Sequence, residues 1–397
     1  MKNRISRLLI ISTRVPFPLV GGDRIRMYNF CKVLAKEYKV DLLVVNEGNV
    51  ERSAIEELES IGVRVIVFDF SRMRFRLNAL QGVFLDKPLQ VGYYFFKEVQ
   101  AWITTHIHEY DIALCNHIRS AEYLRHLPVK KIIDLHDAIS LNYARASKHA
   151  SGLWKWIYTI ENKRVLPYEL KCIESFDKSL IVSQVDKEFL AQSGAPSEKI
   201  CVLPVAIDEL KFQHTSGWEE KNWIVFVGKM DTVANSDAAV YFALFIFPRI
   251  RAIMPNIEFY IVGADPSPSV QRLGKIPGVH VTGNVENHID YLRQAKVVID
   301  PMRFGAGMQN KVLEAMALGK PVVASKIATE GIEGEDGVHY LVADAPEDVV
   351  SQIVALFSDG SLRERLGDSG KKLVREKYSW NVVARSLLAV VNEVTGS

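Results

Sequence analysis

The sequence predicts an α/β protein made of two doubly wound domains, each built on a parallel sheet. Short apolar runs rich in Val and Ile alternate with segments of helical periodicity along the 397 residues. Most of these runs are apolar throughout, which is typical of parallel strands covered on both faces by helices. The pattern restarts near residue 222, so we expect two Rossmann-like domains of similar size.

Thirteen apolar runs account for the predicted strands. In the first half they are 7–12, 38–45, 63–68, 111–115, 130–135, 178–183 and 199–204, and in the second half 222–228, 257–263, 279–283, 296–301, 320–325 and 339–343. The polar, aperiodic segment 205–221 is the predicted linker. We therefore place the domains at 1–210 and 211–377. We expect residues 378–397, which begin with an amphipathic helix, to cross back to the first domain.

Composition excludes several classes of protein. A net charge of +2 is too small to indicate a nucleic-acid-binding protein. A hydrophobic content of 48% is ordinary for a globular protein. The four cysteines show neither CxxC spacing nor a zinc-like cluster, which indicates buried thiols in a reducing compartment. The apolar run at 8–12 is too short for a signal peptide, and we find no apolar stretch of about 18 residues. We expect a cytoplasmic protein.

Two segments of the first domain combine basic and aromatic residues. These are 71–98 and 151–164, and residues 1–215 hold 30 Lys and Arg residues against 25 Asp and Glu residues. Such segments can lie on the anionic inner face of a plasma membrane. The alternative is an irregular helical insert that packs on its own domain.

The stretch "FGAGMQNKVLEAMALGKPVV" at 304–323 has the pattern of a loop, a helix and a strand. Gly305 and Gly307 permit positive φ and close approach of the backbone. The backbone N–H groups of residues 308–310 start the helix, where the dipole favours a phosphate. Lys311 adds positive charge, and Glu314 is placed one turn later to accept hydrogen bonds from ribose hydroxyls. The alternative is a structural glycine turn with a Lys–Glu surface pair.

This stretch, followed by "EGI" (330–332) and "GVHYLVAD" (337–344), resembles the nucleotide-sugar signature of retaining GT-B glycosyltransferases of family 4. "FVGKM" (226–230) and "GVHVTGNV" (278–285) follow the family order, and "DLHD" (134–137) is a weaker echo. The resemblance is closest to bacterial surface-polysaccharide enzymes. It implies a GT-B fold with a cleft between the domains, a UDP- or GDP-sugar donor and no required metal or other cofactor.

The resemblance also implies a set of donor-binding residues. They are Gly228, Lys229, Gly283, Val285, Gly305, Ala306, Gly307, Met308, Gln309, Asn310, Lys311 and Glu314. Two positions depart from the family. Ala306 replaces the first of two glutamates, which usually holds the transferred sugar, and "MDTVAN" after Lys229 lacks a second basic residue. Lys311 or an arginine of the first domain is the expected substitute.

The remaining candidates follow strands of the first domain. Gly21, Gly22 and Arg24 open the first helix, and Arg14 follows the first strand, where it can meet an anionic group of the acceptor. By resemblance His136 touches the donor sugar, with Asp137 beside it on the acceptor side. The alternative for His136 is a structural histidine capped by Asp137. Together with Lys229 and Glu314, His136 completes the expected catalytic set.

We therefore expect a hexosyltransferase that moves a sugar with retention to a hydroxyl of a glycan or lipid-linked acceptor. Backbone donors, a helix dipole and lysines would stabilise the departing diphosphate. Two alternatives remain open. One is a GT-B sugar-nucleotide 2-epimerase. The other is a donor-binding, non-catalytic subunit of a polysaccharide complex, which Ala306 suggests.

Overall fold

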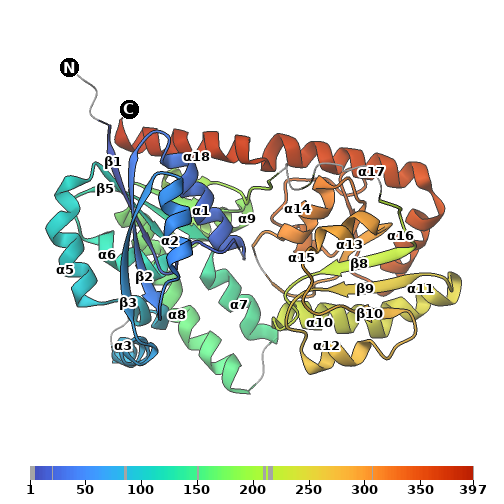
Figure 1. The fold of residues 1–397 in the computed structure, drawn as a ribbon. Helices are drawn as coiled ribbons and strands as arrows, with labels where there is room; N and C mark the ends of the chain where they lie inside the picture. The colour runs from blue at the N-terminus through green and yellow to red at the C-terminus, as the bar shows by residue number, and fades with distance from the viewer. Residues whose placement is uncertain are drawn as a thin grey trace. The chain divides into compact units, whose positions relative to one another are not determined.

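The computed structural model describes residues 5–19, 21–84, 87–149, 152–208, 212, 218–305 and 307–396. The chain forms two compact units (Figure 1). Unit 1 comprises Met1–Val205 and Val383–Ser397, and unit 2 comprises Ala206–Val382. The sequence analysis placed the corresponding boundaries at 210/211 and 377/378.

Unit 1 is built on a seven-stranded sheet in the order β3-β2-β1-β4-β5-β6-β7, and every neighbouring pair is parallel. The strands are β1 (Arg7–Ser12), β2 (Lys39–Glu47), β3 (Val63–Phe70), β4 (Ile112–Asn116), β5 (Lys130–His136), β6 (Lys178–Ile181) and β7 (Ile200–Val202). All residues of β4 are buried, as expected for a strand covered on both faces. Each predicted strand of this half is present.

Helices of unit 1 cover both faces of its sheet (Figure 1). They are α1 (Gly22–Leu34), α2 (Arg52–Ser60), α3 (Arg72–Phe84), α4 (Leu89–Tyr94), α5 (Lys97–His106), α6 (Ile118–Arg125), α7 (Ile139–His149), α8 (Gly152–Ser175) and α9 (Gln184–Gln192), with 3-10 turns at Ile107–Glu109 and Ser197–Lys199. The segment 71–98 contains α3, α4 and the start of α5, and its Phe75, Val91 and Phe96 are buried in the unit 1 core. Met73 and Leu77 of the same segment are exposed.

Unit 2 repeats the architecture with a six-stranded parallel sheet in the order β10-β9-β8-β11-β12-β13. Its strands are β8 (Trp223–Val227), β9 (Glu258–Val262), β10 (Val279–Val281), β11 (Val297–Asp300), β12 (Val322–Ala324) and β13 (Leu341–Val342). The helices are α10 (Val233–Tyr241), α11 (Phe247–Ile253), α12 (Pro268–Leu273), α13 (Ile289–Gln294), α14 (Asn310–Ala317), α15 (Lys326–Thr329), α16 (Pro346–Ser358) and α17 (Gly360–Leu373), with π-helical turns at Phe242–Ile246 and Val374–Tyr378.

Helix α14 shows why the chain turns from helix to strand after residue 317. Gly319 has φ +70°, and its N–H donates to the carbonyl of Met316 at 2.9 Å. The N–H of Lys320 donates to the carbonyl of Ala315 at 3.0 Å, which completes a Schellman motif. A Cβ on Gly367 of α17 would lie 2.1 Å from the Gly319 carbonyl oxygen, so α17 packs directly on this helix end.

The helical stretch Val233–Ile253 is long and apolar enough to cross a membrane, by length and composition alone. Its mean hydropathy is 1.2, and the sequence analysis did not single it out. Phe242, Phe247 and Ile250 lie in the core of unit 2. The outward-facing Leu244 and Phe245 explain why its hydropathy exceeds that of an ordinary amphipathic helix. We assign it as a core helix.

In the last helix, α18 (Trp380–Thr395), the residues from Val383 onward belong to unit 1. Val383, Leu387 and Val391 are spaced four residues apart and are buried, which is the helical period of an apolar face. Two polar contacts hold the helix end to unit 1: Tyr38 Oη donates to Asn392 Oδ1 at 2.7 Å, and Lys178 pairs with Glu393 at 2.7 Å.

Candidate functional site

Each unit has one point where the order of its strands reverses. In unit 2 the chain runs outward through β8, β9 and β10 and then returns to place β11 on the other side of β8. In open α/β sheets, ligands bind beyond the carboxyl ends of the two strands at such a switch point. The segments that follow Val227 and Asp300 are therefore the first place to look for a ligand site in unit 2.

The glycine loop after β11 has the backbone that the sequence analysis expected. Gly305 has φ +151° and Gly307 has φ +73°. A Cβ on Gly331 would lie 3.2 Å from Met308 Cα, so the "EGI" turn packs on this loop and holds it. In the described part of the chain, the backbone N–H groups of Met308 and Asn310 have no hydrogen-bond acceptor. Ala306 lies outside the described residues.

Lys311 is turned into unit 2 rather than toward open space. Its Nζ lies 3.3 Å from Asp300 Oδ1, 2.8 Å from Asn235 Oδ1 and 4.6 Å from the centroid of the Phe226 ring. Burial lowers the pKa of Lys311, and burial raises the pKa of Asp300, while each charge opposes the shift of the other. The pair joins the first turn of α14 to the end of β11. The Lys311–Glu314 surface pair, which was the alternative to a ligand site, is not formed.

Asn235 occupies the place where the sequence lacks a second basic residue. Its Nδ2 donates to the Lys229 carbonyl at 3.0 Å, while its Oδ1 accepts from Lys311. A Cβ on Gly228 would lie 2.8 Å from Asn235 Nδ2, so Gly228 makes room for this contact. Asn235 thus links the loop after β8 to the first turn of α14, across the switch point.

Lys229 is the exposed cation of this edge. Its Nζ lies 2.9 Å from Asp231 Oδ2 and 3.9 Å from Asp265 Oδ2. The hydrogen bond with Asp231 raises the pKa of Lys229, so the side chain stays charged. With its side chain 58% exposed, the ammonium can exchange Asp231 for a ligand phosphate at little cost.

Glu314 has a partner that sequence reasoning missed. His288 Nε2 lies 3.0 Å from Glu314 Oε2, and the two side chains are 38% and 22% exposed. His288 precedes α13, in the loop that also contains Gly283, whose φ is +68° with open space where a Cβ would stand. Val285 of this loop packs on the unit 2 core. The only sign of this pair in the sequence is a histidine three residues after Val285. That it contacts Glu314 depends on how the loop and α14 come together in the fold.

In unit 1, His136 ends β5 with φ +70°, beside a register irregularity between Asp134 and His136. Positive φ is rare for a residue with a side chain, and it persists only where the surroundings enforce it. Buried Arg26 donates to both oxygens of Asp134 at 2.9 Å, and it also donates to the Leu203 carbonyl at 3.0 Å. The end of β5 is thereby fixed to α1 and to the segment after β7.

The turn after His136 is held by two buried carboxylates. The N–H of Ala138 donates to Asp186 Oδ1 at 3.2 Å, and the N–H of Ile139 donates to Glu169 Oε1 at 2.7 Å. Burial raises the pKa of Glu169 to about 8, so this carboxyl holds a proton near neutral pH. Asp137 lies in this turn. The turn therefore has a defined conformation before any ligand binds.

The start of α1 carries the other acceptor-side candidates. Gly21 has φ +92° at the N-cap, and Gly22 is the first residue of the helix. Arg14 pairs with Asp23 at 3.2 Å. Arg24 lines a cavity of about 180 Å³ together with Val15, Phe17, Pro18, Asn46, Asn49, Val50, Glu51 and Ala54.

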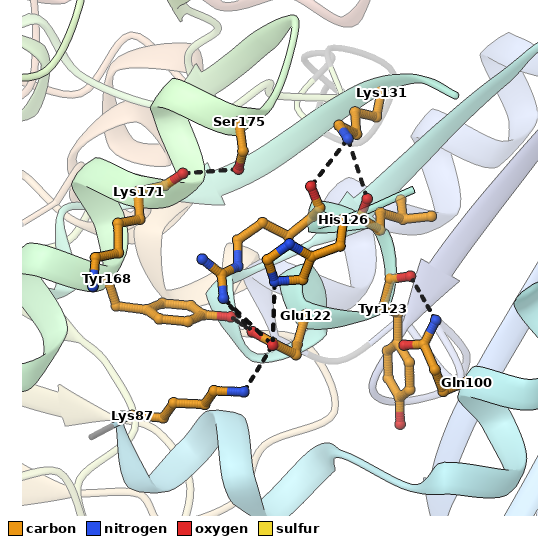
Figure 2. A network of polar contacts seen from close by, with 11 residues as sticks. Lys87, Gln100, Glu122, Tyr123, His126, Lys131, Tyr168, Lys171 and Ser175 are labelled. Atoms are coloured by element: carbon orange, nitrogen blue, oxygen red, sulfur yellow. Dashed lines mark hydrogen bonds and ion pairs between the residues drawn. The ribbon is translucent and has the colours of Figure 1, made fainter. Parts of the chain in front are cut away.

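Helix α6 is anchored by the polar network of Figure 2. Glu122 accepts from Lys87 Nζ at 2.7 Å and from Tyr168 Oη at 2.9 Å, and it pairs with Arg125 at 3.2 Å. Burial alone would raise the pKa of Glu122, but Lys87 and Arg125 hold it below its usual range. Lys131 Nζ donates to the carbonyls of Leu124, Arg125 and Leu127, which satisfies the helix end.

The structure thus separates the predicted residues into two groups. Gly228, Lys229, Gly305, Gly307, Lys311 and Glu314 gather around the β8/β11 switch point of unit 2, and Gly283 is linked to them through its loop neighbour His288. Arg14, Gly21, Gly22, Arg24, His136 and Asp137 lie beyond the carboxyl ends of β1 and β5 in unit 1.

Comparison with known proteins relates part of the chain to a protein family. Residues 221–359 match the family model of the glycosyl transferases group 1. The match takes in β8 to β13 and the switch point between β8 and β11. Lys229, Gly305, Gly307, Lys311 and Glu314 all lie within the matched residues.

Solved structures show that the whole chain has the GT-B fold. Anabaena Alr3699/HepE in complex with UDP and glucose matches with a TM-score of 0.70 at 16% identity, over 98% of this chain and 100% of that one. Sucrose-phosphate synthase from Thermosynechococcus elongatus gives a TM-score of 0.72 at 15% identity, over 98% and 99%. At these identities the likeness establishes the fold alone.

The relatives by sequence include one that matches over nearly its full length and others that match over a shorter part of the chain. A Klebsiella pneumoniae protein, called an uncharacterized 44.6 kDa protein in the cps region, is 23% identical over 96% of this chain and 99% of its own length. Phosphatidyl-myo-inositol mannosyltransferase from Mycobacterium tuberculosis is 28% identical over 44% of this chain and 48% of its own length.

Proposed function

We propose that this protein transfers a sugar from a UDP- or GDP-sugar to a hydroxyl of a glycan or lipid-linked acceptor, with retention of the anomeric configuration. The observation that carries the proposal is the edge of unit 2. A positive-φ glycine loop, the first turn of α14 and Glu314 lie on one side of the β8/β11 switch point, and the exposed Lys229 lies on the other.

The chemistry demands stabilisation of a departing diphosphate. The N–H groups of Met308 and Asn310 and the ammonium of Lys229 are the donors that this edge can offer. Glu314 receives the ribose hydroxyls through the oxygen that His288 does not contact. We assign Lys311 a supporting part, because its ammonium is already held by Asp300 and Asn235.

Retention is proposed to proceed on the front face, with the leaving phosphate taking the acceptor proton, and no metal or other cofactor is required. His136 is proposed to contact the transferred sugar. The positive φ of His136 and the two buried carboxylates behind its loop support this role, because strained residues persist where the surroundings enforce them.

The relatives support a sugar donor and a glycan acceptor. The solved Anabaena protein contains UDP and glucose, the mycobacterial relatives are mannosyltransferases, and the Klebsiella relative is encoded in a cps region. Fold likeness by itself does not separate activities, because a putative UDP-N-acetylglucosamine 2-epimerase from Listeria monocytogenes also matches, with a TM-score of 0.60 at 14% identity.

A second candidate function is a donor-binding subunit that does not catalyse transfer. Ala306 favours it, because no carboxylate stands at that position to hold the transferred sugar. The two functions differ in turnover. A catalytic protein releases nucleoside diphosphate from its donor when the correct acceptor is present, whereas a binding subunit retains donor affinity and releases none with any acceptor.

We further propose that the enzyme is cytoplasmic and contacts the inner membrane face through segments 71–98 and 151–164. Met73, Leu77 and Trp156 are 71%, 52% and 64% exposed, which suits insertion into a membrane interface. Arg72 and Arg74 are paired with acidic side chains, so the apolar groups carry most of this proposal. Co-sedimentation with anionic vesicles should fall in a Met73→Ser/Leu77→Ser variant, and unchanged binding would contradict the membrane contact.

A thermal-shift panel of nucleotide sugars tests the central proposal. A donor present at about 100 times its dissociation constant should stabilise the folded protein by roughly 2.7 kcal/mol. We expect one base, uracil or guanine, to give the larger shift. Absence of a shift with every common UDP- and GDP-sugar would remove the basis for donor binding.

A further inference from the structure

Unit 1 has a switch point of its own, between β1 and β4. The chain runs outward through β1, β2 and β3 and then returns to place β4 on the other side of β1. Beyond the carboxyl ends of these two strands stand Arg14, His117 and Arg119, and the start of α1 adds Asp23 and Arg24. Three arginines therefore gather with one carboxylate, where ligands of open sheets bind.

The positive charge of this cluster is incompletely compensated. Asp23 pairs with Arg14 at 3.2 Å. Among the described residues, no carboxylate lies within ion-pair distance of Arg24 or Arg119, and the Nε atom of each is buried without a hydrogen-bond partner. The guanidinium of Arg119 lies 5.5 Å from the centroid of the Tyr94 ring. Burial lowers the pKa of Arg119, and Tyr94 and the charge of Asp23 offset this only in part.

His117 adds a neutral ring whose one nitrogen hydrogen-bonds to the backbone of Leu135, while its buried Nε2 has no partner among the described residues. Its ring stands edge-on to that of His136 at 5.6 Å. Burial, followed by the charges of Arg119, His136 and Arg14, lowers the pKa of His117 well below its ordinary value. Both histidines have positive φ, 62° for His117 and 70° for His136. Such a constellation is unfavourable unless a ligand compensates it.

We propose that the β1/β4 switch point of unit 1 is an anion site that binds a phosphate group of the acceptor through Arg119 and Arg14, with His117 beside them. Guanidinium groups suit phosphate because their planar N–H forks match its oxygens. Arg24 borders the cluster and also lines the cavity of about 180 Å³, whose Val15, Phe17 and Val50 suit an apolar group attached to the phosphate. The inference rests on the proposed function, since it names the acceptor class.

The test measures pyrophosphate binding to the full-length protein by calorimetry, with nucleoside diphosphate at saturation so that the unit 2 site is filled. We expect Arg119→Gln to weaken pyrophosphate binding by about tenfold or more, because hydrogen bonds to charged groups are the stronger class. Arg52→Gln, which removes a 91% exposed arginine, is the matched control and should leave the affinity unchanged. A titration with geranyl diphosphate then shows where the bound phosphate group comes from. If the acceptor is prenyl-linked, geranyl diphosphate should bind more tightly than pyrophosphate. If the acceptor is a soluble phosphate, the two should bind equally.

A second measurement guards against misfolding of the variant. In the absence of any anion, Arg119→Gln should keep or raise the melting temperature, because it removes a poorly compensated charge. Lower stability with unchanged pyrophosphate affinity would overturn the proposal in favour of a structural arginine. Loss of nucleotide affinity in Arg119→Gln would instead place the cluster on the donor and also overturn it. Nucleotide binding by the wild-type protein is measured in a separate titration. A negative result at the anion site therefore does not affect the proposal for the donor site.

Discussion

The two switch points differ in how far their charged side chains are paired. In unit 2, Lys229 pairs with Asp231, Lys311 with Asp300, and Glu314 with His288. In unit 1, Arg24 and Arg119 have no carboxylate within ion-pair distance in the described structure, and His117 keeps an unpaired buried nitrogen. The same architecture thus presents one edge of compensated charges and one edge with excess positive charge.

This difference indicates what each edge is suited to bind. A compensated edge suits a ligand that exchanges partners, as a diphosphate would when it replaces Asp231 beside Lys229. An uncompensated edge gains most from an anion that supplies the missing charge. Each edge can be altered separately, and the following predictions run from the largest expected effect to the smallest.

The buried Lys311–Asp300 pair should contribute most to stability. Asp300→Asn leaves the Lys311 charge buried without its counter-ion, and we expect the free energy of unfolding to fall by about 3–5 kcal/mol. Asp231→Asn removes the partner of an exposed lysine and should change the free energy of unfolding far less. Urea denaturation of both variants makes the comparison. Equal small losses would show that the charges of unit 2 are not integrated into its core.

Glu169 should give unit 1 a dependence of stability on pH. Its pKa is raised to about 8 in the folded protein from an ordinary 4.5, so between these values the native state holds a proton that the unfolded chain has released. The free energy of unfolding should therefore fall as pH rises through this window, by up to about 1.4 kcal/mol per pH unit. Urea denaturation at pH 5.5 and 7.5 measures the effect.

Glu169→Gln should remove this part of the slope, whereas Glu174→Gln, an exposed position on the same helix, should keep it. If wild type and Glu169→Gln lose stability equally between the two pH values, the carboxyl behind the His136 loop is ionised throughout.

Lys229 should matter for ligand affinity rather than for stability. Lys229→Ala is expected to weaken binding of the nucleoside diphosphate by about tenfold, because a charge-assisted hydrogen bond to the diphosphate is lost. Asp231→Asn releases the ammonium and should strengthen binding by about twofold, within the small energies of exposed ion pairs. Calorimetric titration of both variants with the nucleoside diphosphate measures these changes in affinity. A Lys229→Ala protein with wild-type affinity would exclude this lysine from the diphosphate site.

His288 should have the smallest effect, and one confined to the ribose. His288→Ala is expected to weaken binding of the ribonucleotide by about three- to fivefold, because Glu314 loses the contact that orients it. A 2′,3′-dideoxy nucleotide should bind the variant and the wild type alike. His280→Ala removes a comparable His–Glu pair on β10 and serves as the control. A uniform loss with both nucleotides would indicate a structural histidine.

The fold was predictable because buried parallel strands leave a continuous apolar run. All thirteen predicted runs correspond to strands, and the helix after the glycine loop ends at Gly319, where the positive φ of a Schellman motif requires glycine. The helix start at Asn310 was also readable, since Gly305 and Gly307 precede it.

The details of the site were less predictable, because they depend on which loops meet. Helical periodicity placed Lys311 and Glu314 near one another, but the inward turn of Lys311 depends on Asp300 at the end of a separate strand. His288 reaches Glu314 only because the loop after β10 comes to α14. In unit 1, Arg14 and Arg24 were predicted to lie on the acceptor side, but His117 and Arg119 were not, because they join Arg14 only through the strand order β1-β4.

The most direct test of the central claim is a thermodynamic cycle between Glu314 and the ribose hydroxyls. Calorimetry would compare wild type and Glu314→Gln, each with the nucleoside diphosphate selected by the thermal-shift panel and with its 2′,3′-dideoxy analogue. Charge-assisted hydrogen bonds to two hydroxyls predict a coupling free energy of about 1.5 kcal/mol or more. A coupling near zero, with the ribonucleotide bound equally by both proteins, would contradict the placement of the donor at the β8/β11 switch point.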